Sequence, residues 1–498
     1  MLTRRDFLKT AAGVTAAGAF GVASAGWAQE KRQPLNVICI LCDDMGAQEL
    51  GCYGNTLHRT PRLDALAAGG TRLDTFYATP VCSPTRVCLM TGRYGFRTGW
   101  CNMRGRGAGS PPKDADLARD EENFGELARK IDCATGFAGK WQLTGDRLAT
   151  MLSDAGFDES LMWIYLNYLD KGEEYRGGFE TPGKDKASRY WHPGLARNGV
   201  HVETTGEDYG PDEFAGFCTD FIGRHKDKPF FFYYPMVLIH QPWLNTPDTK
   251  ELTGRNGDAH LKANVEYADK VVGRIVDALE EHGLREKTVI LFMGDNGTGT
   301  RGKSTPTEWG CRVPFIANCP GTVKEGIVSR ELADISDILP TIIDFAGGTL
   351  PEDIPYDGRS LAPLLRGETD NHREWIFSCL GHYRILRDKR WLLEQNTPED
   401  FGQFWDCGEA RDGRGYKDVT DSEDAEAVAA RERFKQILEK LPFPETTADD
   451  REDFRRFTQN HLAKLNAYID KLDGVPKRKC DLAATRRGSR AERRNEDE

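Results

Sequence analysis

Five polar side chains stand at or directly after the ends of apolar runs in the sequence, and each of them could bind a metal or exchange a proton. They are Asp43, Asp44, His240, Asp295 and Asn296. Apolar runs of this length are typical of strands buried on both faces of a parallel sheet. Because ligands of such sheets bind beyond the carboxyl ends of the strands, we expect these side chains to meet at one site.

The four oxygen donors among them predict a site for a hard divalent cation. Carboxylate and amide oxygens suit Ca²⁺, our first expectation, or Mg²⁺, our second. No histidine follows Asp295, which weakens the case for zinc. Two carboxylates ~4 Å apart repel by about 4 kcal/mol at an effective dielectric constant of ~20, so a convergence of Asp43, Asp44 and Asp295 would require a cation. Any one of these residues, taken alone, could instead serve a turn or a helix cap.

The elements that must position these side chains are the apolar runs at residues 35–41, 230–239 and 289–293. Between the last two runs, apolar residues recur every three or four positions from Leu261 to Leu279. This spacing predicts a helix, which Gly283 would close as a C-cap. A strand–helix–strand unit predicts an α/β fold, a doubly wound, mostly parallel sheet flanked by helices. We expect this catalytic domain to cover residues 33–347.

The composition fits a globular protein and argues against two other classes. The chain has 498 residues, of which 39% are hydrophobic and 29% charged, with a net charge of −11. An acidic balance argues against a nucleic-acid binder, which needs a basic face. No run after residue 30 is long and apolar enough to span a bilayer, so we expect no membrane span.

Shorter and more polar segments begin near residue 348 and predict a smaller C-terminal α+β subdomain over residues 348–475. Within it, residues 377–393 are expected to form strands and residues 421–441 a surface helix. Residues 476–498 are charged and poor in apolar side chains, which predicts a disordered tail. The chain has 13 cysteines, an odd number, so at least one of them is unpaired or modified.

Residues 1–28 have the features of a twin-arginine export signal and are set aside from the fold. Arg4 and Arg5 precede Phe7 and an alanine-rich, weakly apolar stretch with small residues at its end. Such a signal is read by a receptor, here the twin-arginine translocase, and is not a membrane anchor. We expect a bacterial protein that folds in the cytoplasm and is exported to the periplasm or secreted. Any metal or modification needed for folding would be installed before export.

The segment Cys82-Ser83-Pro84-Thr85-Arg86, with Thr91-Gly92-Arg93 downstream, offers a cysteine nucleophile beside an arginine. It resembles the signature of the sulfatase family, Cys-x-Pro-x-Arg followed by Thr-Gly-Arg, and the resemblance extends closely over roughly residues 35–320. It implies that a formylglycine-generating enzyme oxidises Cys82 to formylglycine (3-oxoalanine) during maturation. The hydrated aldehyde would attack sulfur, and its second hydroxyl would then allow sulfate to leave.

The resemblance also implies a metal site. Asp43 and Asp44 are similar to the first pair of metal ligands in the family. Asp295 and Asn296 are similar to the second pair, and the modified Cys82 would face the same ion.

The resemblance further implies a binding site for the sulfate group. Lys140, in Gly139-Lys140-Trp141, and Lys303 are similar to the two lysines that hold sulfate, and Arg86 would orient the nucleophile. His240 is similar to the histidine that contacts the scissile oxygen, and it could protonate the leaving alcohol. With three carboxylates, one divalent cation and three basic side chains, the pocket would carry a charge of about +2 and would attract a sulfate monoester.

One residue departs from the family pattern. The family commonly has a histidine after Gly-Lys-Trp, where this chain has Gln142, and a glutamine amide has no usable basicity. Another group could take the proton, release of sulfate could be slow, or the chain could handle its substrate differently. His201 is a candidate substitute for the missing base.

Two rival functions stay open at this point. One is a phosphate or phosphonate ester hydrolase on the same scaffold, and the other is a sulfated-glycan-binding protein that has lost turnover. For an enzyme, the substrate would be a sulfated small molecule or, preferably, a sulfated glycan. Aromatic residues between the lysine segment and residue 230 could stack on sugar rings, although packing in the core is at least as good a reading; these are Trp163, Tyr165, Tyr168, Tyr190 and Trp191.

Overall fold

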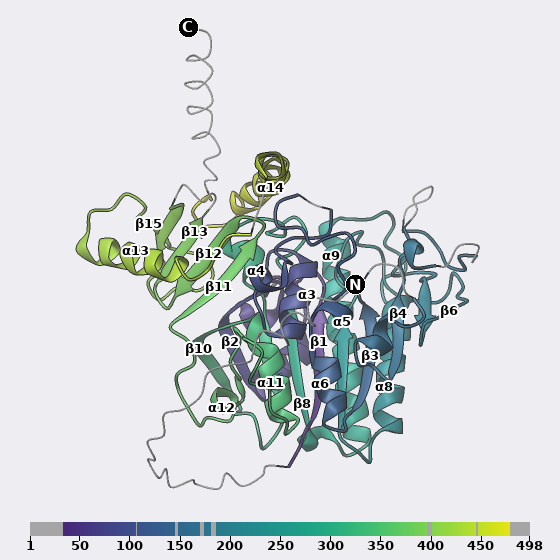
Figure 1. Ribbon diagram of the computed structural model, residues 1–498. Helices are drawn as coiled ribbons and strands as arrows, with labels where there is room; N and C mark the ends of the chain where they lie inside the picture. Colours follow the sequence, from purple (N-terminus) through teal and green to yellow (C-terminus); the bar gives the residue numbers. More distant parts are fainter. Residues whose placement is uncertain are drawn as a thin grey trace, which may run out of the picture.

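The computed structural model describes residues 33–478, apart from 106, 145–147, 170–173, 181–185, 396–400 and 445–446 (Figure 1). The predicted signal at residues 1–28 and nearly all of the predicted tail lie outside the described residues. Of that tail only residues 476–478 are described, and the side chain of Arg478 is buried against Glu394. The described part of the chain therefore extends slightly past the expected end of the subdomain.

A ten-stranded sheet forms the body of the protein, in the order β10-β2-β9-β8-β1-β7-β3-β4-β5-β6 (Figure 1). Its centre is parallel, because β1 pairs in parallel with both β7 and β8, and β3 pairs in parallel with β7 and β4. The predicted doubly wound, mostly parallel sheet is confirmed. The strands are β1 (Asn36–Cys42), β2 (Thr71–Tyr77), β3 (Ala134–Lys140), β4 (Glu159–Trp163), β5 (Leu195–Arg197), β6 (Val200–Val202), β7 (Phe230–Pro235), β8 (Thr288–Gly294), β9 (Phe315–Asn318) and β10 (Ile327–Asp334).

Helices cover both faces of this sheet, and the alternation of side chains along β1 determines which cluster each residue joins. Val37, Cys39 and Leu41 pack in the cluster with α3 (Cys82–Thr91), α6 (Phe124–Lys130) and α11 (Ile338–Phe345). The residues between them pack in the cluster on the other face, which includes α2 (Pro61–Ala68), α8 (Gly210–Arg224) and α9 (Asp258–Glu281).

The strand–helix–strand prediction is confirmed around α9. The apolar residues predicted to line the helix from Leu261 to Leu279 are buried. The helix ends at Glu281, and Gly283 follows with a left-handed φ of 64°, a conformation that glycine adopts at no steric cost. The chain then enters β8, whose seven residues are all buried.

The predicted strand at residues 230–239 is shorter than expected, because β7 ends at Pro235. Proline has no N–H to donate to the ladder, and the chain beyond it turns across the end of β1. The backbone N–H of Asp43 donates to the carbonyl of Leu238 at 2.7 Å, and the N–H of Ile239 donates to the carbonyl of Asp43 at 2.7 Å. This crossing, and not the strand itself, brings His240 to the end of β1.

A second, antiparallel sheet of five strands lies within the predicted C-terminal subdomain, and residues 377–393 fall in its first three strands as expected. The predicted surface helix is α13, which begins after the side-chain cap of Asp424 and buries one face that includes Ala430 and Phe434. These elements are β11 (Trp375–Leu380), β12 (Tyr383–Asp388), β13 (Trp391–Gln395), β14 (Gln403–Asp406), β15 (Lys417–Asp418), α13 (Ala425–Leu438) and α14 (Ala448–Ile469).

Short helices and 3₁₀ turns complete the described elements. They are α4 (Gly95–Thr98), α5 (Leu117–Asp120), α7 (Met151–Asp154), α10 (Glu308–Cys311), α12 (Ala362–Leu365), η1 (Ala47–Glu49), η2 (Gly51–Tyr53), η3 (Leu166–Tyr168), η4 (Arg285–Lys287) and η5 (Ile335–Asp337).

A buried ionic network joins the two sheets at Glu308. Its carboxylate pairs with the guanidinium of Arg387 on β12 and accepts hydrogen bonds from Tyr77 at 2.6 Å and Tyr416 at 2.8 Å. The Arg387 side chain has no exposed surface. Although burial opposes ionisation, the Arg387 charge holds the pKa of Glu308 below its usual value.

We expect Arg387→Met to lower the free energy of unfolding by about 3–5 kcal/mol, because it leaves Glu308 as an uncompensated buried charge. Urea unfolding followed by circular dichroism would measure the loss. Lys435→Ala, at an exposed ion pair on α13, is the control and should change stability by less than about 0.5 kcal/mol. An unchanged unfolding midpoint in Arg387→Met would contradict this role of the network.

Candidate active site

Four oxygen-bearing residues from two neighbouring strands form a buried group, which we call the acidic cluster: Asp43, Asp44, Asp295 and Asn296. The first two follow β1 and the last two follow β8. All four side chains are buried. The backbone N–H of Asp44 donates to Asp295 Oδ1 at 2.9 Å, and Asn296 Nδ2 donates to Asp44 Oδ1 at 2.9 Å. The parallel pairing of β1 with β8 thus brings together residues 252 positions apart in the chain.

The acidic cluster has the donor set and the unsatisfied atoms that a hard cation needs. Asp43 Oδ1 and Asn296 Oδ1 are buried and have no hydrogen-bond partner among the described residues. Ligand atoms of Asp43, Asp295 and Cys82 lie within 4.8 Å of one another, as do those of Asp43, Asp44 and His240. Burial and the neighbouring Asp43 carboxylate raise the pKa of Asp295 to about 7. A divalent ion would relieve this repulsion, so the residues fit Ca²⁺ or Mg²⁺.

Cys82 and Arg86 reach the acidic cluster from α3. Cys82 is the first residue of the helix and Arg86 lies one turn later, so both point from the same face. Arg86 is fully buried; its Nη2 donates to Asp295 Oδ2 at 2.7 Å and lies 3.6 Å from Asp43 Oδ1. The start of a helix favours negative charge, and Cys82 occupies that position with only 2% of its surface exposed.

Two lysines contact the acidic cluster from separate elements. Lys140, the last residue of β3, places Nζ 2.8 Å from Asp43 Oδ2, and Lys303 pairs with Asp44 Oδ1. Burial opposes their charges, but Asp43 and Asp44 respectively raise the pKa values of Lys140 and Lys303. Both lysines therefore stay positive beside the carboxylates.

His240 faces the acidic cluster through Nε2, which lies 3.8 Å from Asp44 Oδ2. Its Nδ1 is bonded to the carbonyl of Gln241, and because a carbonyl only accepts, Nδ1 carries the hydrogen. Burial lowers the pKa of His240, and the nearby cations of Arg189 and Lys303 lower it further.

Of the two remaining candidates, Gln142 lies close to Lys140 in the chain, whereas His201 lies at the edge of the sheet. Gln142 lies two residues beyond Lys140 with a left-handed φ of 70°, and its Oε1 is buried without a hydrogen-bond partner in the described part of the chain. His201 lies on β6, the outermost strand of that edge, and its ring stacks on Tyr175 with centroids 5.7 Å apart. The structure does not bring His201 to the acidic cluster, because β6 lies three strands beyond β3.

A further basic residue, Arg189, reaches the site and was missed by the sequence analysis. Its guanidinium is 1% exposed and places Nη1 3.8 Å from Asp43 Oδ2. It comes from the stretch between η3 and β5, which has no long helix or strand and where no periodicity marks it, and arginines are usually exposed. The aromatic residues between the lysine segment and residue 230 mostly pack in the core, since Trp163, Tyr168 and Tyr190 are buried.

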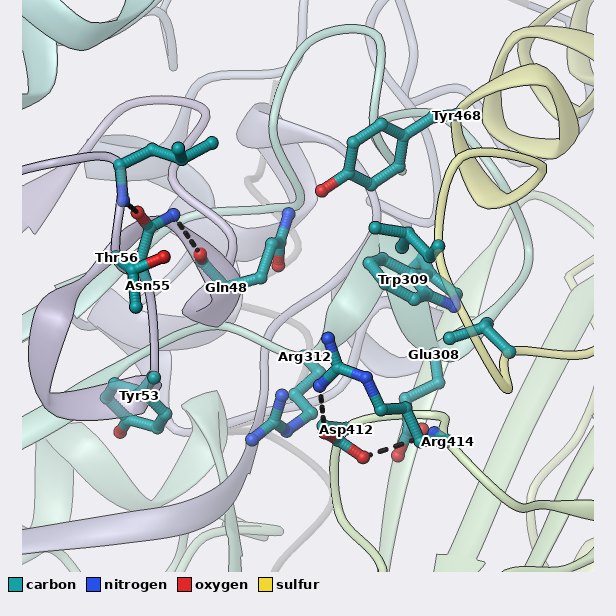
Figure 2. A pocket seen from close by; sticks show the side chains of 14 residues that line it. Gln48, Tyr53, Asn55, Thr56, Glu308, Trp309, Arg312, Asp412, Arg414 and Tyr468 are labelled. Carbon is teal, nitrogen blue, oxygen red and sulfur yellow. Dashed lines mark hydrogen bonds and ion pairs between the residues drawn. The ribbon is translucent and has the colours of Figure 1, made fainter.

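A separate cavity of about 280 Å³ lies between residues 48–57, the segment 308–312 and the C-terminal part of the chain (Figure 2). Trp309 and Tyr468 line it with their rings, and Arg414 pairs with Asp412 at its rim. The residues of the acidic cluster do not line this cavity.

Comparison with known proteins decides the family. A model described as Sulfatase matches residues 35–348. The chain belongs to the sulfatase family. It is 32% identical to human arylsulfatase A over 369 residues, which cover 69% of this chain and 70% of that protein. It is likewise 32% identical to human N-acetylgalactosamine-6-sulfatase, over 67% of this chain and 66% of that protein. This sulfatase is therefore an enzyme that hydrolyses sulfate esters.

Solved structures agree with this sulfatase fold. The crystal structure of Ps i-CgsB is similar with a TM-score of 0.69 and 23% identity, covering 87% of this chain and 99% of that one. The same protein in complex with k-i-k-neocarrahexaose gives a TM-score of 0.67, also with 23% identity, over 87% of this chain and 99% of that one.

The N-terminus of the sulfatase carries an export signal. A model of the twin-arginine translocation pathway signal sequence matches residues 1–21, so the enzyme is exported by that pathway to the periplasm or beyond. In the described part of the chain, no helix has the length and apolarity to cross a membrane. The twelve cysteines of the described ranges are free thiols.

We expect Ca²⁺ to stabilise the chelator-treated protein, by about 2.7 kcal/mol when its concentration is 100 times the dissociation constant. Asp295→Asn should weaken this effect strongly, because it removes a carboxylate from the cluster. Thermal unfolding with and without Ca²⁺ or Mg²⁺ would measure both. Asp220→Asn, at an exposed residue of α8, is the control and should respond as the wild type does. Equal stabilisation of Asp295→Asn and wild type would refute a metal site at this cluster.

Proposed function

We propose that this sulfatase cleaves sulfate esters of carbohydrates through formylglycine at position 82, with Ca²⁺ held by the acidic cluster. The observation that carries the proposal is the approach of Cys82 to Asp43 and Asp295, with ligand atoms within 4.8 Å of one another. A nucleophile derived from Cys82 would lie directly beside the ion. The cysteine is buried at the start of α3, where the helix dipole also stabilises a developing negative charge.

Asp43, Asp44, Asp295 and Asn296 would hold the ion. When bound, Ca²⁺ would neutralise charge on the sulfate and lower the pKa of the attacking hydroxyl. Formylglycine would supply that hydroxyl in its hydrated form, together with the second hydroxyl whose deprotonation releases sulfate.

Three basic side chains would bind and orient the substrate. Arg86 is fixed by Asp295 and by the carbonyl of Lys140, to which its Nη1 donates at 3.2 Å. Lys140 and Lys303 hold their ammonium groups on opposite members of the Asp43–Asp44 pair. Hydrogen-bond donors fixed in advance in a buried site stabilise charge that develops in the transition state, so these residues would bind the sulfonyl oxygens.

His240 would serve the leaving alcohol. Its Nδ1 hydrogen is committed to the Gln241 carbonyl, so Nε2 is the nitrogen available to the substrate. Burial and the cations of Arg189 and Lys303 lower the pKa of His240 and disfavour the imidazolium before substrate binds. The negative charge of a bound sulfate ester would favour it, and Nε2 would then carry a proton that it could donate to the departing oxygen.

A carbohydrate substrate is supported by two kinds of relative. The curated relatives include an N-acetylgalactosamine-6-sulfatase, and the structurally similar Ps i-CgsB was crystallised with k-i-k-neocarrahexaose. Desulfation of defined sulfated oligosaccharides, compared with 4-nitrophenyl sulfate, would test the class. A clear preference for 4-nitrophenyl phosphate over its sulfate would instead favour the rival phosphate or phosphonate ester hydrolase.

We expect Cys82→Ala to abolish sulfate release, with a loss of at least about 1,000-fold in kcat, because the nucleophile is gone. Mass spectrometry of the wild-type peptide around residue 82 should find formylglycine. Cys88→Ala is the matched control, since Cys88 is buried on the same helix but packs in the core, and it should retain turnover. An unmodified cysteine in active wild-type protein would defeat the mechanism, and turnover in Cys82→Ala would do the same.

We expect Gln142→His to raise kcat by roughly 100-fold, because an imidazole at this position can accept the proton that an amide cannot. The left-handed backbone of residue 142 is a conformation that histidine tolerates better than most residues. Pre-steady-state kinetics should find a burst of alcohol in the wild type and a weaker burst in the variant. Gln142→Asn is the control and should leave the burst unchanged. An unchanged kcat in Gln142→His would mean that another group already takes the proton.

A further inference from the structure

Arg189 is a buried cation at the edge of the proposed sulfate site, and the proposed mechanism gives it no role. Its Nε donates to Glu180, and its guanidinium carbon lies 4.4 Å from the centre of the Trp163 ring. Its Nη1 is buried and has no hydrogen-bond partner within the described residues. One end of the guanidinium is therefore fixed by partners, while the other presents an unused donor.

The unused donor points to the position where Lys140 acts. Arg189 Nη1 lies 3.8 Å from Asp43 Oδ2, the same oxygen that lies 2.8 Å from Lys140 Nζ. A separation of 3.8 Å is too long for a hydrogen bond. The two cations, Arg189 and Lys140, thus converge on one oxygen of Asp43, and the two hydrogens of Nη1 remain available to a third group.

The backbone on both sides of Arg189 is fixed, so the guanidinium is held in place before any ligand arrives. The indole of Trp163 donates to the carbonyl of Ser188 at 3.1 Å. On the other side, the hydroxyl of Tyr190 donates to the carbonyl of His240 at 2.6 Å. The Tyr190 contact also attaches the β4–α8 segment to the segment that carries His240.

The charges around Arg189 leave an excess of positive charge. Glu180 is shared between Arg189 and Lys186, whose Nζ lies 3.0 Å from it. One carboxylate therefore balances only one of two cations. Asp43 lies 3.8 Å from Arg189 Nη1, but it already has Lys140 at 2.8 Å, and Asp295 and Asp44 are paired with Arg86 and Lys303. The acidic cluster therefore balances the second cation only in part.

We propose that Arg189 is a substrate-binding residue whose Nη1 donates a hydrogen bond to an oxygen of the sulfate group, beside Lys140. This inference rests on the proposed function, because it places the sulfate group at Cys82 and Lys140. A sulfate oxygen provides the acceptor that Arg189 Nη1 lacks. It also provides negative charge to balance Arg189 and Lys186, which share the single carboxylate of Glu180. The arginine comes from the segment between β4 and α8 and lies outside the Cys-x-Pro-x-Arg and Gly-Lys-Trp motifs.

The test compares binding of inorganic sulfate by the calcium-loaded protein. Replacing Arg189 alone would remove one of the two cations that pair with Glu180 and leave Lys186 as the other, so the main variant is Arg189→Met combined with Glu180→Gln. We expect its dissociation constant for sulfate, from titration calorimetry, to rise tenfold to hundredfold, because a hydrogen bond to a charged group is lost. The KM for a sulfate ester should rise with it, while the melting temperature stays close to that of the double control Arg197→Met/Glu180→Gln, whose Arg197 is exposed on β5.

Arg189→Lys provides a second measurement that keeps the charge and the partner of Glu180. A lysine cannot bond Glu180 and reach the sulfate at once, so its affinity for sulfate should also fall about tenfold. Wild-type affinity in either folded variant would overturn the proposal and leave Arg189 as a structural partner of Glu180. Failure of the proposed function would look different, since Cys82→Ala would then keep releasing sulfate or active wild-type protein would carry an unmodified cysteine at position 82.

Discussion

Three carboxylates, from Asp43, Asp44 and Asp295, are buried together at the carboxyl edge of the sheet, and their mutual repulsion is the constraint around which the site is built. Each is held by a cation from a different element: Arg86 from α3, Lys140 from β3 and Lys303 from the loop after β8. Such a group is costly to desolvate unless it is fully paired. The same buried charges that cost desolvation free energy therefore also form a binding site for a divalent ion and an anionic substrate.

The strand order follows from this constraint. β1 lies between β7 and β8, and β3 lies on the far side of β7, so the ends of three strands deliver Asp43, Asp295 and Lys140 to one edge. The early end of β7 at Pro235 leaves room for residues 236–240 to cross the end of β1. The second sheet is fastened to this edge through Glu308, five residues after Lys303, so the subdomain steadies the loop that carries the lysine.

The sequence could predict those elements in which the spacing of apolar residues indicates which side chains are buried. The apolar runs before Asp43 and Asp295 predicted β1 and β8, and the spacing from Leu261 to Leu279 predicted α9, because buried strands and amphipathic helices leave periodic signals. The end of β7 was placed too late, since the apolar residues after Pro235 are buried without being a strand. Arg189 could not be found, because it lies in a stretch without periodicity and its burial depends on tertiary contacts with Glu180 and with Trp163 at the end of β4. His201 was chosen for its chemistry alone, and the sheet order separates it from the cluster.

The burial of Cys82 has a consequence for how active enzyme accumulates. Only 2% of the residue is accessible once α3 has packed against the sheet, so the proposed conversion of Cys82 to formylglycine would have to take place before the helix packs. Molecules that fold before modification would keep an unmodified cysteine and would still be exported in the folded state. The specific activity of a preparation would then depend on the relative rates of folding and of Cys82 modification in the cytoplasm, and not on the folded structure alone.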